Sequence, residues 1–212
     1  MTLISASLLS CKDNLEEVTK EFNELDIDLI HLDIMDGEFV PYHSFSYDEI
    51  KKIVNNTNKP FDVHLMVKNP EKYIYDYAML NTKFITIHYE AMNDIKVLEK
   101  IRSYGIRCGI SIKPDTDVEE IYDILPLLDL VLVMSVEPGK GGQEFMPKAL
   151  DKIQKLDKKI KSLGLNVLIS VDGGINNNSA AMCINSGVDM LVIGSALVNS
   201  NDRKTFLKKC KQ

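Results

Sequence analysis

The feature that most constrains the fold of this chain is a regular alternation of short apolar segments with longer amphipathic ones. The apolar segments have the length and composition of strands that are buried on both faces of a parallel sheet. Eight such strands are predicted, at residues 3–9, 29–35, 61–66, 84–89, 107–112, 130–136, 166–171 and 190–196.

Apolar residues at helical spacing fill the intervals between these strands. The predicted helices cover residues 14–25, 46–56, 70–80, 94–105, 117–125, 149–164, 177–187 and 203–210. Gly105, Gly164 and Gly187 each stand where a helix must end before the next strand begins. Because no linker or change of composition interrupts the alternation, we expect a single α/β domain over residues 1–212. A closed (β/α)8 barrel, the TIM barrel, fits eight such units better than an open doubly wound sheet.

Composition limits the partners of this domain. The 212 residues are 45% hydrophobic and carry a formal net charge of −6, which argues against a nucleic-acid partner. The N-terminal segment lacks the basic region of a signal peptide, and no apolar run approaches the ~20 residues of a membrane span. The four cysteines lie far apart without a CxxC pair. We therefore expect a cytoplasmic protein with reduced thiols and no membrane partner.

Four polar residues lie at or near the ends of predicted buried strands. Side chains alternate along a strand, so His31 and Asp33 share one face; His64 and Asp172 lie near the ends of two other strands. In a barrel the carboxyl ends of the strands meet at one face. Buried carboxylates are costly unless they are paired or bind a metal. Two imidazoles and two carboxylates can bind one divalent cation, such as Zn, Fe(II), Mn or Co.

Methionines accompany these residues at the same strand ends. Met35, Met66 and Met134 are interpreted either as core filling or as an apolar wall that keeps water from a reactive intermediate. The two remaining histidines carry less weight. His88 is interpreted as a structural or supporting residue, and His43 as a solvated loop residue.

Glycines form a second group, in the loops after the last three predicted strands. Barrels often bind phosphate in this region through exposed backbone N–H groups. A phosphorylated small molecule is therefore the expected ligand. The candidate residues are Gly139, Lys140, Gly141, Gly142, Gly173, Gly174, Gly194 and Ser195.

Five stretches of the chain resemble a known family in the same order: "HLDIMDGEFVP", "FDVHLMVKNPEKYI", "ITIHYEA", "DLVLVMSVEPGKGGQEF" and "VDGGI…GVDMLVIGSA". They are similar to ribulose-phosphate 3-epimerase, and the similarity runs from "ISASLLS" to "GSALV". The resemblance implies a TIM barrel of the ribulose-phosphate-binding type. It also implies a metal-dependent isomerase of the pentose phosphate pathway that interconverts D-ribulose 5-phosphate and D-xylulose 5-phosphate.

Matched residue by residue, the resemblance implies that the metal ligands are His31, Asp33, His64 and Asp172. It implies that Asp33 and Asp172 also act as the acid and base that move the C3 proton through a 2,3-enediolate. It leaves open which aspartate serves which epimer. The implied substrate contacts are Ser7, His64, Gly139, Lys140, Gly141, Gly142, Gly173, Gly174, Gly194 and Ser195, with Met35, Met66 and Met134 flanking the intermediate.

This chain departs from the family pattern at several positions. These are Ala6, the loop residues Tyr42, His43 and Ser46, and Lys113 and Lys140. None removes an implied ligand or base, but they leave the sugar open. The alternatives are a 3-epimerase for a hexulose or heptulose phosphate, such as D-allulose 6-phosphate, and a non-catalytic sugar-phosphate-binding barrel. The native metal is also open, and so is the oligomeric state, with a homo-oligomer one of the options.

Overall fold

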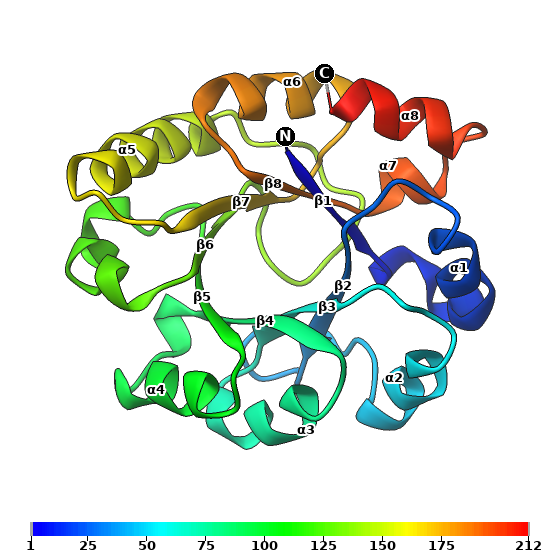
Figure 1. The fold of residues 1–212 in the computed structure, drawn as a ribbon, viewed down its shortest axis with the longest axis horizontal. Coiled ribbons are helices and arrows are strands. Elements are labelled where there is room, and N and C mark those ends of the chain that lie inside the picture. The colour runs from blue at the N-terminus through cyan, green and yellow to red at the C-terminus, as the bar shows by residue number, and fades with distance from the viewer. Residues whose placement is uncertain (1, 212) are drawn as a thin grey trace.

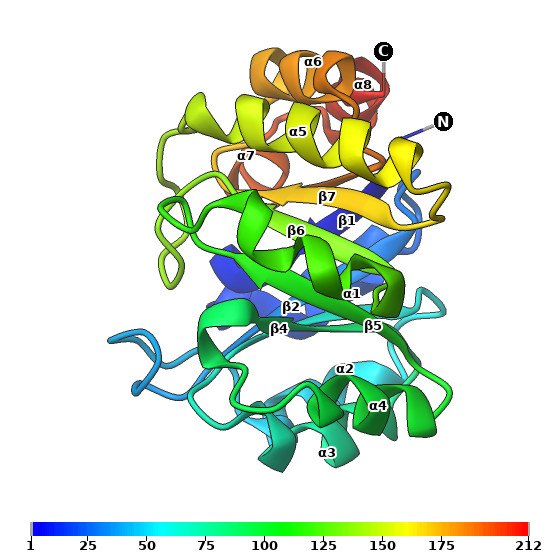
Figure 2. The same cartoon turned by 90° about the vertical axis from the view of Figure 1, so that its left-hand side faces the viewer.

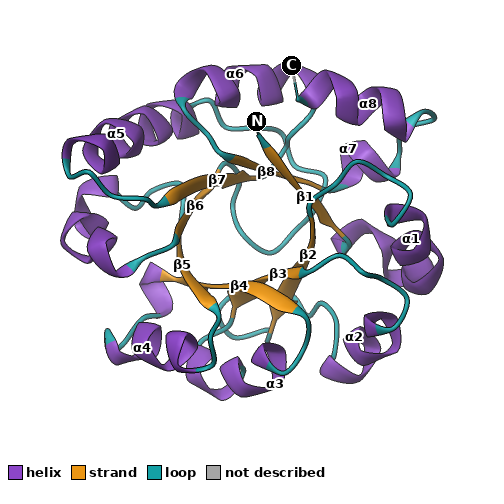
Figure 3. Ribbon diagram, viewed as in Figure 1, coloured by secondary structure: helices purple, strands orange, loops and turns teal. Residues whose placement is uncertain are grey.

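The computed structural model describes residues 2–211 and contains a closed barrel of eight parallel strands. Each strand pairs with the next along the chain, and β8 closes the barrel against β1. Figures 1 and 3 show this ring of strands with the helices around it. The predicted TIM barrel is thus confirmed. The strands are β1 (Leu3–Ser7), β2 (Leu29–Met35), β3 (Phe61–Met66), β4 (Thr82–His88), β5 (Arg107–Ile112), β6 (Leu130–Met134), β7 (Leu168–Asp172) and β8 (Met190–Ile193).

Seven α-helices of the outer layer follow the predicted order, mostly with shorter bounds. They are α1 (Leu15–Phe22), α2 (Tyr47–Val54), α3 (Ile74–Ala78), α4 (Lys96–Ser103), α5 (Lys148–Ser162), α6 (Asn177–Ser186) and α8 (Arg203–Cys210). The short helix α7 (Ser195–Val198) was not predicted, because residues 195–196 were assigned to the last strand. Four 3-10 helices add to them: η1 (Leu9–Asn14), η2 (Pro70–Lys72), η3 (Tyr89–Ala91) and η4 (Val118–Leu127).

Two of the predicted helices also differ in form from the prediction. The segment predicted as a helix over residues 117–125 forms the 3-10 helix η4, which contains Pro126. Proline has no backbone N–H and cannot continue an α-helical ladder. The helix predicted over residues 70–80 is divided at Tyr73 into η2 and α3. The three glycines predicted to end helices, Gly105, Gly164 and Gly187, have φ values of 75°, 62° and 105°, as such positions require.

Two apolar layers hold the barrel together. The larger layer lies between the sheet and the helices, and Phe22, Ile50 and Leu65 in it are fully buried. The smaller layer fills the barrel interior and includes Leu29, Phe84, Leu130 and Met190. Because the interior is packed with side chains, a ligand can approach only at an end of the barrel.

Strand register brings the polar residues to one level of the barrel. Between β2 and β3, His31 pairs with Asp62 and Asp33 pairs with His64. Met134 of β6 pairs with Asp172 of β7, and Ser7 of β1 pairs with His31. The loop after β6, yellow-green in Figure 1, crosses the opening of the barrel. The side view in Figure 2 shows long loops extending from the same end as that loop.

The four cysteines are buried free thiols. Among residues 2–211, no helix is both long and apolar enough to cross a membrane.

Candidate active site

The four residues predicted to bind a metal meet at the carboxyl end of the barrel. His31, Asp33, His64 and Asp172 each offer one ligand atom, and these atoms all lie within 4.8 Å of one another. His31 Nε2 lies 3.3 Å from Asp33 Oδ1, and His64 Nδ1 lies 3.5 Å from the same oxygen. Asp172 Oδ2 lies 3.9 Å from His31 Nε2 and 4.0 Å from His64 Nδ1. Both imidazoles are fully buried. The four residues extend from three strands, β2, β3 and β7, and their ligand atoms converge on one point.

Two ring nitrogens in this group have no hydrogen-bond partner. They are His31 Nε2 and His64 Nδ1, both buried, and both are directed at the carboxylates. The other nitrogen of His31, Nδ1, lies 2.8 Å from Asp62 Oδ2. A buried polar atom without a partner is costly, and an imidazole lone pair facing two carboxylates is a ligand for a divalent cation. The residues present therefore fit a bound metal ion, and the donor set suits several metals.

The two aspartates of the group differ in their protonation behaviour. Burial raises the pKa of Asp33, but the nearby imidazoles of His31 and His64 outweigh it and hold that pKa well below its usual range. Burial, together with the nearby charge of Asp33, raises the pKa of Asp172 to about 7. Environments that separate the pKa values of two neighbouring carboxyl groups are typical of acid–base pairs.

Sequence reasoning missed the residues that hold the ligands in place. Asp62, which is 2% exposed, accepts a hydrogen bond of 2.8 Å from Ser5 Oγ while it also contacts His31. Ser7 Oγ donates to Asp33 Oδ2 at 2.9 Å. Ser7 was predicted only as a substrate contact. A signal for Asp62 existed, because strand alternation places it on the same face as His64.

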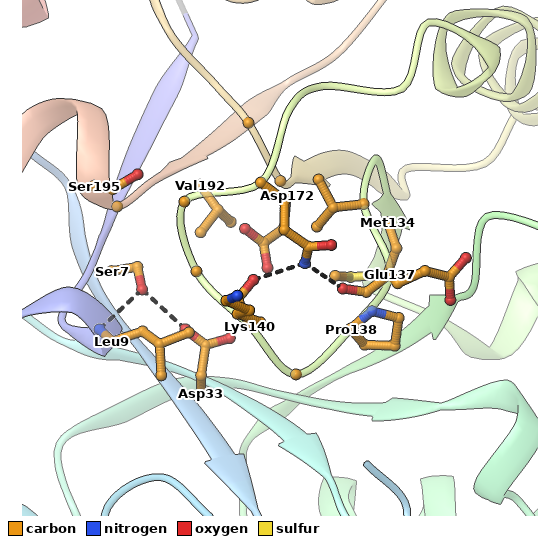
Figure 4. Close-up of a pocket in the computed structure, with 18 of the residues that line it drawn as sticks. Ser7, Leu9, Asp33, Met134, Glu137, Pro138, Lys140, Asp172, Val192 and Ser195 are labelled. Atoms are coloured by element: carbon orange, nitrogen blue, oxygen red, sulfur yellow. Dashed lines mark hydrogen bonds between the residues drawn. The ribbon is translucent and has the colours of Figure 1, made fainter. Parts of the chain in front are cut away.

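Above the ligands lies a cavity with an empty volume of about 540 Å³. All three predicted methionines line it, together with Asp33 and Asp172, while His31 and His64 lie buried beneath. Figure 4 shows Asp33 and Asp172 directed into the space, with Met134 beside Asp172. The lining also contains every residue of the predicted phosphate group: Gly139, Lys140, Gly141, Gly142, Gly173, Gly174, Gly194 and Ser195.

Two glycines in this wall allow loops to pack closely. Gly174 has φ +64°, and a Cβ placed on it would lie 2.3 Å from the backbone nitrogen of Phe145. Gly139 has φ +114°, and its Cβ would lie 2.9 Å from Cδ2 of Tyr42. Neither position accepts a side chain without movement. These glycines therefore bring the loops after β2, β6 and β7 against one another at the cavity.

Three departures from the family pattern lie in the loops after β2 and β5. Tyr42 is 45% exposed and contacts Gly139 of the cavity wall. His43 is exposed, as predicted, although its ring packs against Gly37. The Lys113 ammonium lies 4.2 Å from the centroid of the Phe39 ring.

The other three departures lie at the cavity, at a helix N-terminus and in the buried apolar layer. Lys140 is exposed and lines the cavity. Ser46 caps the N-terminus of α2 through a reciprocal pair of hydrogen bonds with Glu49. Ala6 is fully buried in the layer between the sheet and the helices. None of these residues displaces a candidate ligand.

Comparison with known proteins identifies the family. The model of the ribulose-phosphate 3-epimerase family matches residues 3–198. Curated proteins named ribulose-phosphate 3-epimerase are similar along most of the chain. The Mycobacterium tuberculosis protein is 40% identical over 82% of this chain and 77% of its own length. The Methanocaldococcus jannaschii protein is 36% identical over 100% of this chain and 91% of its own length. The Bacillus subtilis protein is 33% identical over 98% of this chain and 95% of its own length.

Solved structures resemble the fold at low sequence identity. KGPDC from Streptococcus mutans has a TM-score of 0.73 at 11% identity, covering 100% of this chain and 96% of its own. The tryptophan synthase α-subunit from Campylobacter jejuni has a TM-score of 0.65 at 15% identity, covering 99% and 94%. These likenesses concern the barrel alone. The family match and the curated relatives carry the identification: this chain belongs to the ribulose-phosphate 3-epimerase family.

Proposed function

We propose that this chain is a metal-dependent isomerase that interconverts D-ribulose 5-phosphate and D-xylulose 5-phosphate by inverting C3. One observation carries the proposal. Two buried imidazole nitrogens without partners face Asp33 and Asp172 at the base of a cavity with glycine-rich loops in its wall. The curated relatives named ribulose-phosphate 3-epimerase support the same reaction, and we assign it to the pentose phosphate pathway as the family resemblance implies. We expect it to run in the cytoplasm, where the buried free cysteines would stay reduced.

Epimerisation requires a proton to leave one face of C3 and a proton to return to the other face. Asp33 extends from β2 and Asp172 from β7, so the two carboxyl groups reach the cavity from different strands. We assign them as the base and the acid, with the roles exchanged in the reverse direction. His31, Asp33, His64 and Asp172 would hold the cation, which when bound supplies Lewis-acid stabilisation of the negative charge on the substrate oxygens.

Other residues of the chain would orient the substrate and exclude water. Ser7 holds Asp33 through its hydrogen bond to Oδ2. Met35, Met66 and Met134 give the cavity an apolar wall, which strengthens the electrostatic interactions inside it. We assign the sugar phosphate to the backbone N–H groups around Gly142, Gly174, Gly194 and Ser195, with Lys140 close enough to add a positive charge.

Turnover in deuterated water tests this assignment. Protein loaded with a divalent metal should form D-xylulose 5-phosphate from D-ribulose 5-phosphate and incorporate one deuterium at C3. Asp33→Asn and Asp172→Asn should each lower the rate by about 10²- to 10⁴-fold. The exposed helix residue Asp48 supplies a control as Asp48→Asn, which should keep the wild-type rate. If both active-site variants kept that rate, the two-aspartate assignment would be wrong.

A related sugar phosphate is a second candidate, because Tyr42 replaces the residue usual in the family and contacts Gly139 of the cavity wall. The same assay with D-allulose 6-phosphate separates the two. Faster turnover of that hexulose phosphate, with negligible turnover of D-ribulose 5-phosphate, would select the alternative. Binding of either sugar without exchange at C3 would indicate a non-catalytic barrel.

A further inference from the structure

A third buried histidine adjoins the candidate metal site without belonging to it. His88 ends β4 and is fully buried. Its Nε2 lies 3.0 Å from Nε2 of His64, and its Nδ1 lies 3.1 Å from Oε2 of Glu90. Its ring also packs against Phe39, with the centroids 4.6 Å apart. Both nitrogens of this buried ring therefore have polar partners, and one of those partners is a candidate metal ligand.

Hydrogen-bond donor and acceptor rules fix the direction of this chain of contacts. A histidine that binds a metal through Nδ1 must carry its proton on Nε2. His64 would then donate from Nε2 to Nε2 of His88, which must accept. His88 must therefore carry its own proton on Nδ1 and donate it to Glu90. With His64 bound to a metal through Nδ1, this is the one arrangement of protons that satisfies both the His64–His88 contact and the His88–Glu90 contact.

Glu90 is suited to anchor the far end of this chain. A carboxylate only accepts hydrogen bonds, and Oε1 of Glu90 is already engaged by two donors from the loop after β5. The Lys113 backbone N–H donates to it at 2.8 Å, and the Thr116 hydroxyl donates to it as well. These contacts leave Oε2 directed at His88. Glu90 therefore requires His88 to be a donor at Nδ1.

The other candidate ligand, His31, is held in a different way. Its Nδ1 contacts the buried carboxylate of Asp62 directly, at 2.8 Å. Partners of this kind fix the tautomer and ring orientation of a ligating histidine and commonly change metal affinity by 10- to 100-fold. His64 has no carboxylate at its Nε2 and contacts His88 there instead.

We propose that His88 and Glu90 are positioning residues that hold His64 in the tautomer and orientation that present Nδ1 to the metal. The inference rests on the proposed metal site. Neither residue contacts the ligand cluster except through His64, so their effect on the reaction is indirect. Removing the pair should weaken metal binding while the barrel still folds.

Zinc affinity, measured by competition with a chromophoric chelator, tests the proposal. His88→Phe removes the acceptor for His64 and should weaken zinc binding by about 10- to 100-fold. His88→Gln restores an acceptor oxygen in the same region and should stay within about threefold of wild type, on the same scale of effects. Glu90→Ala removes only the anchor and should give an intermediate loss, and it keeps the test open if His88→Phe does not fold.

Thr86→Val is the matched control for these variants. Thr86 lies two residues before His88 on the same strand, and its buried hydroxyl has no hydrogen-bond partner. Its loss should leave zinc affinity within twofold of wild type, because no hydrogen bond is removed. A purely structural role for His88 predicts the opposite pattern, with a lower melting temperature of the chelated protein and unchanged zinc affinity. That pattern would overturn the inference.

The tautomers can also be observed directly. The chain has four histidines, so side-chain ¹⁵N spectra of the zinc-loaded protein should resolve them. We expect His64 protonated at Nε2 and His88 protonated at Nδ1; His88 protonated at Nε2 would overturn the inference. Failure of the wild-type protein to bind zinc or another divalent cation would instead remove the metal site, and the positioning role with it. The zinc affinity of the wild-type protein thus tests the proposed function. The ratio of the zinc dissociation constants of His88→Phe and wild type tests this inference.

Discussion

The hydroxyl of Ser7 donates a 2.9 Å hydrogen bond to Oδ2 of Asp33, whose other oxygen faces the two buried imidazoles. The same hydroxyl accepts from the backbone N–H of Leu9 at 3.2 Å. Ser7 is therefore fixed by the start of η1 and in turn fixes the carboxylate. The two oxygens of Asp33 thus have different surroundings: Oδ2 faces Ser7 of β1, and Oδ1 faces His31 and His64.

We expect Ser7→Ala to lower kcat and zinc affinity by about tenfold each, because Asp33 loses the group that orients it. The free energy of unfolding should fall by about 1 to 3 kcal/mol, since the buried carboxylate loses a hydrogen bond. Steady-state kinetics and chelator competition measure the first two. Ser170→Ala is the control, because Ser170 is also buried in a strand but its hydroxyl has no partner. Equal effects of both variants would show that orientation of Asp33 is unimportant.

Asp172→Asn should change stability in opposite directions with and without metal. In protein without metal, burial and the neighbouring negative charge of Asp33 raise the pKa of Asp172 to about 7. The amide removes the unfavourable charge of Asp172, so at pH 8 the variant should be more stable than wild type by about 1 to 3 kcal/mol. With zinc at 100 times its dissociation constant, wild type should gain about 2.7 kcal/mol that the variant largely lacks.

Urea unfolding with and without chelator measures both differences. Asp115→Asn, which changes an exposed carboxylate, should show neither. A wild-type protein more stable than Asp172→Asn in the presence of chelator would contradict the electrostatic cost assigned to this residue.

Substitutions at two glycines distinguish the energetic cost of backbone strain from that of disturbed loop packing. Gly164 and Gly174 have nearly equal φ values, +62° and +64°, but a Cβ at Gly164 meets nothing within 4 Å. Gly164→Ala should therefore cost only the strain of a left-handed backbone, about 1 kcal/mol. Gly174→Ala also forces a Cβ against the backbone of Phe145, and should cost about 3 kcal/mol or more. It should raise KM for the sugar phosphate, whereas Gly164→Ala should not.

Thermal unfolding and steady-state kinetics on the two variants check this pair. If Gly174→Ala behaved like Gly164→Ala in both, the close approach of the loops after β6 and β7 would have no functional weight.

Sequence reasoning predicted the barrel and the candidate ligands because both depend on local patterns. Strand alternation alone places His31 and Asp33 on one face, and the barrel topology brings His64 and Asp172 to the same end. The role of Asp62 depended on which residue of β2 lies opposite it, which is set by the register between strands. The same limit applies to His88, whose partner His64 lies on the neighbouring strand.

Loop packing was also beyond the reach of the sequence pattern. The glycines after β6 and β7 were predicted to bind phosphate, but Gly139 and Gly174 also admit Tyr42 and Phe145 at close range. Such contacts depend on the paths of two loops at once. The 3-10 form of η4 was missed for a different reason, because the apolar spacing of residues 117–125 suits either type of helix and Pro126 lies beyond the predicted end.

Glu90 should make the free energy of unfolding depend on pH in a defined direction. Burial raises its pKa, but hydrogen bonds from His88, Thr116 and the Lys113 backbone N–H outweigh burial and bring the pKa down to about 2. A carboxyl group whose pKa is lower in the folded state contributes stability at neutral pH. That contribution is complete above the unfolded value near 4.5. It is lost as the pH falls from there toward 2.

In chelated protein, Glu90→Gln should therefore be less stable than wild type at pH 7, by about 1 to 2 kcal/mol after allowance for partial exposure to solvent. The difference should stay constant down to about pH 5 and shrink as the pH falls toward 3. Urea unfolding across this range measures it. Glu119→Gln is the control, because Glu119 pairs only with the exposed Lys155 and should give little difference at any pH. A difference for Glu90→Gln that grew on acidification would reverse the assigned sign, and would mean that folding raises the pKa of Glu90 above its unfolded value.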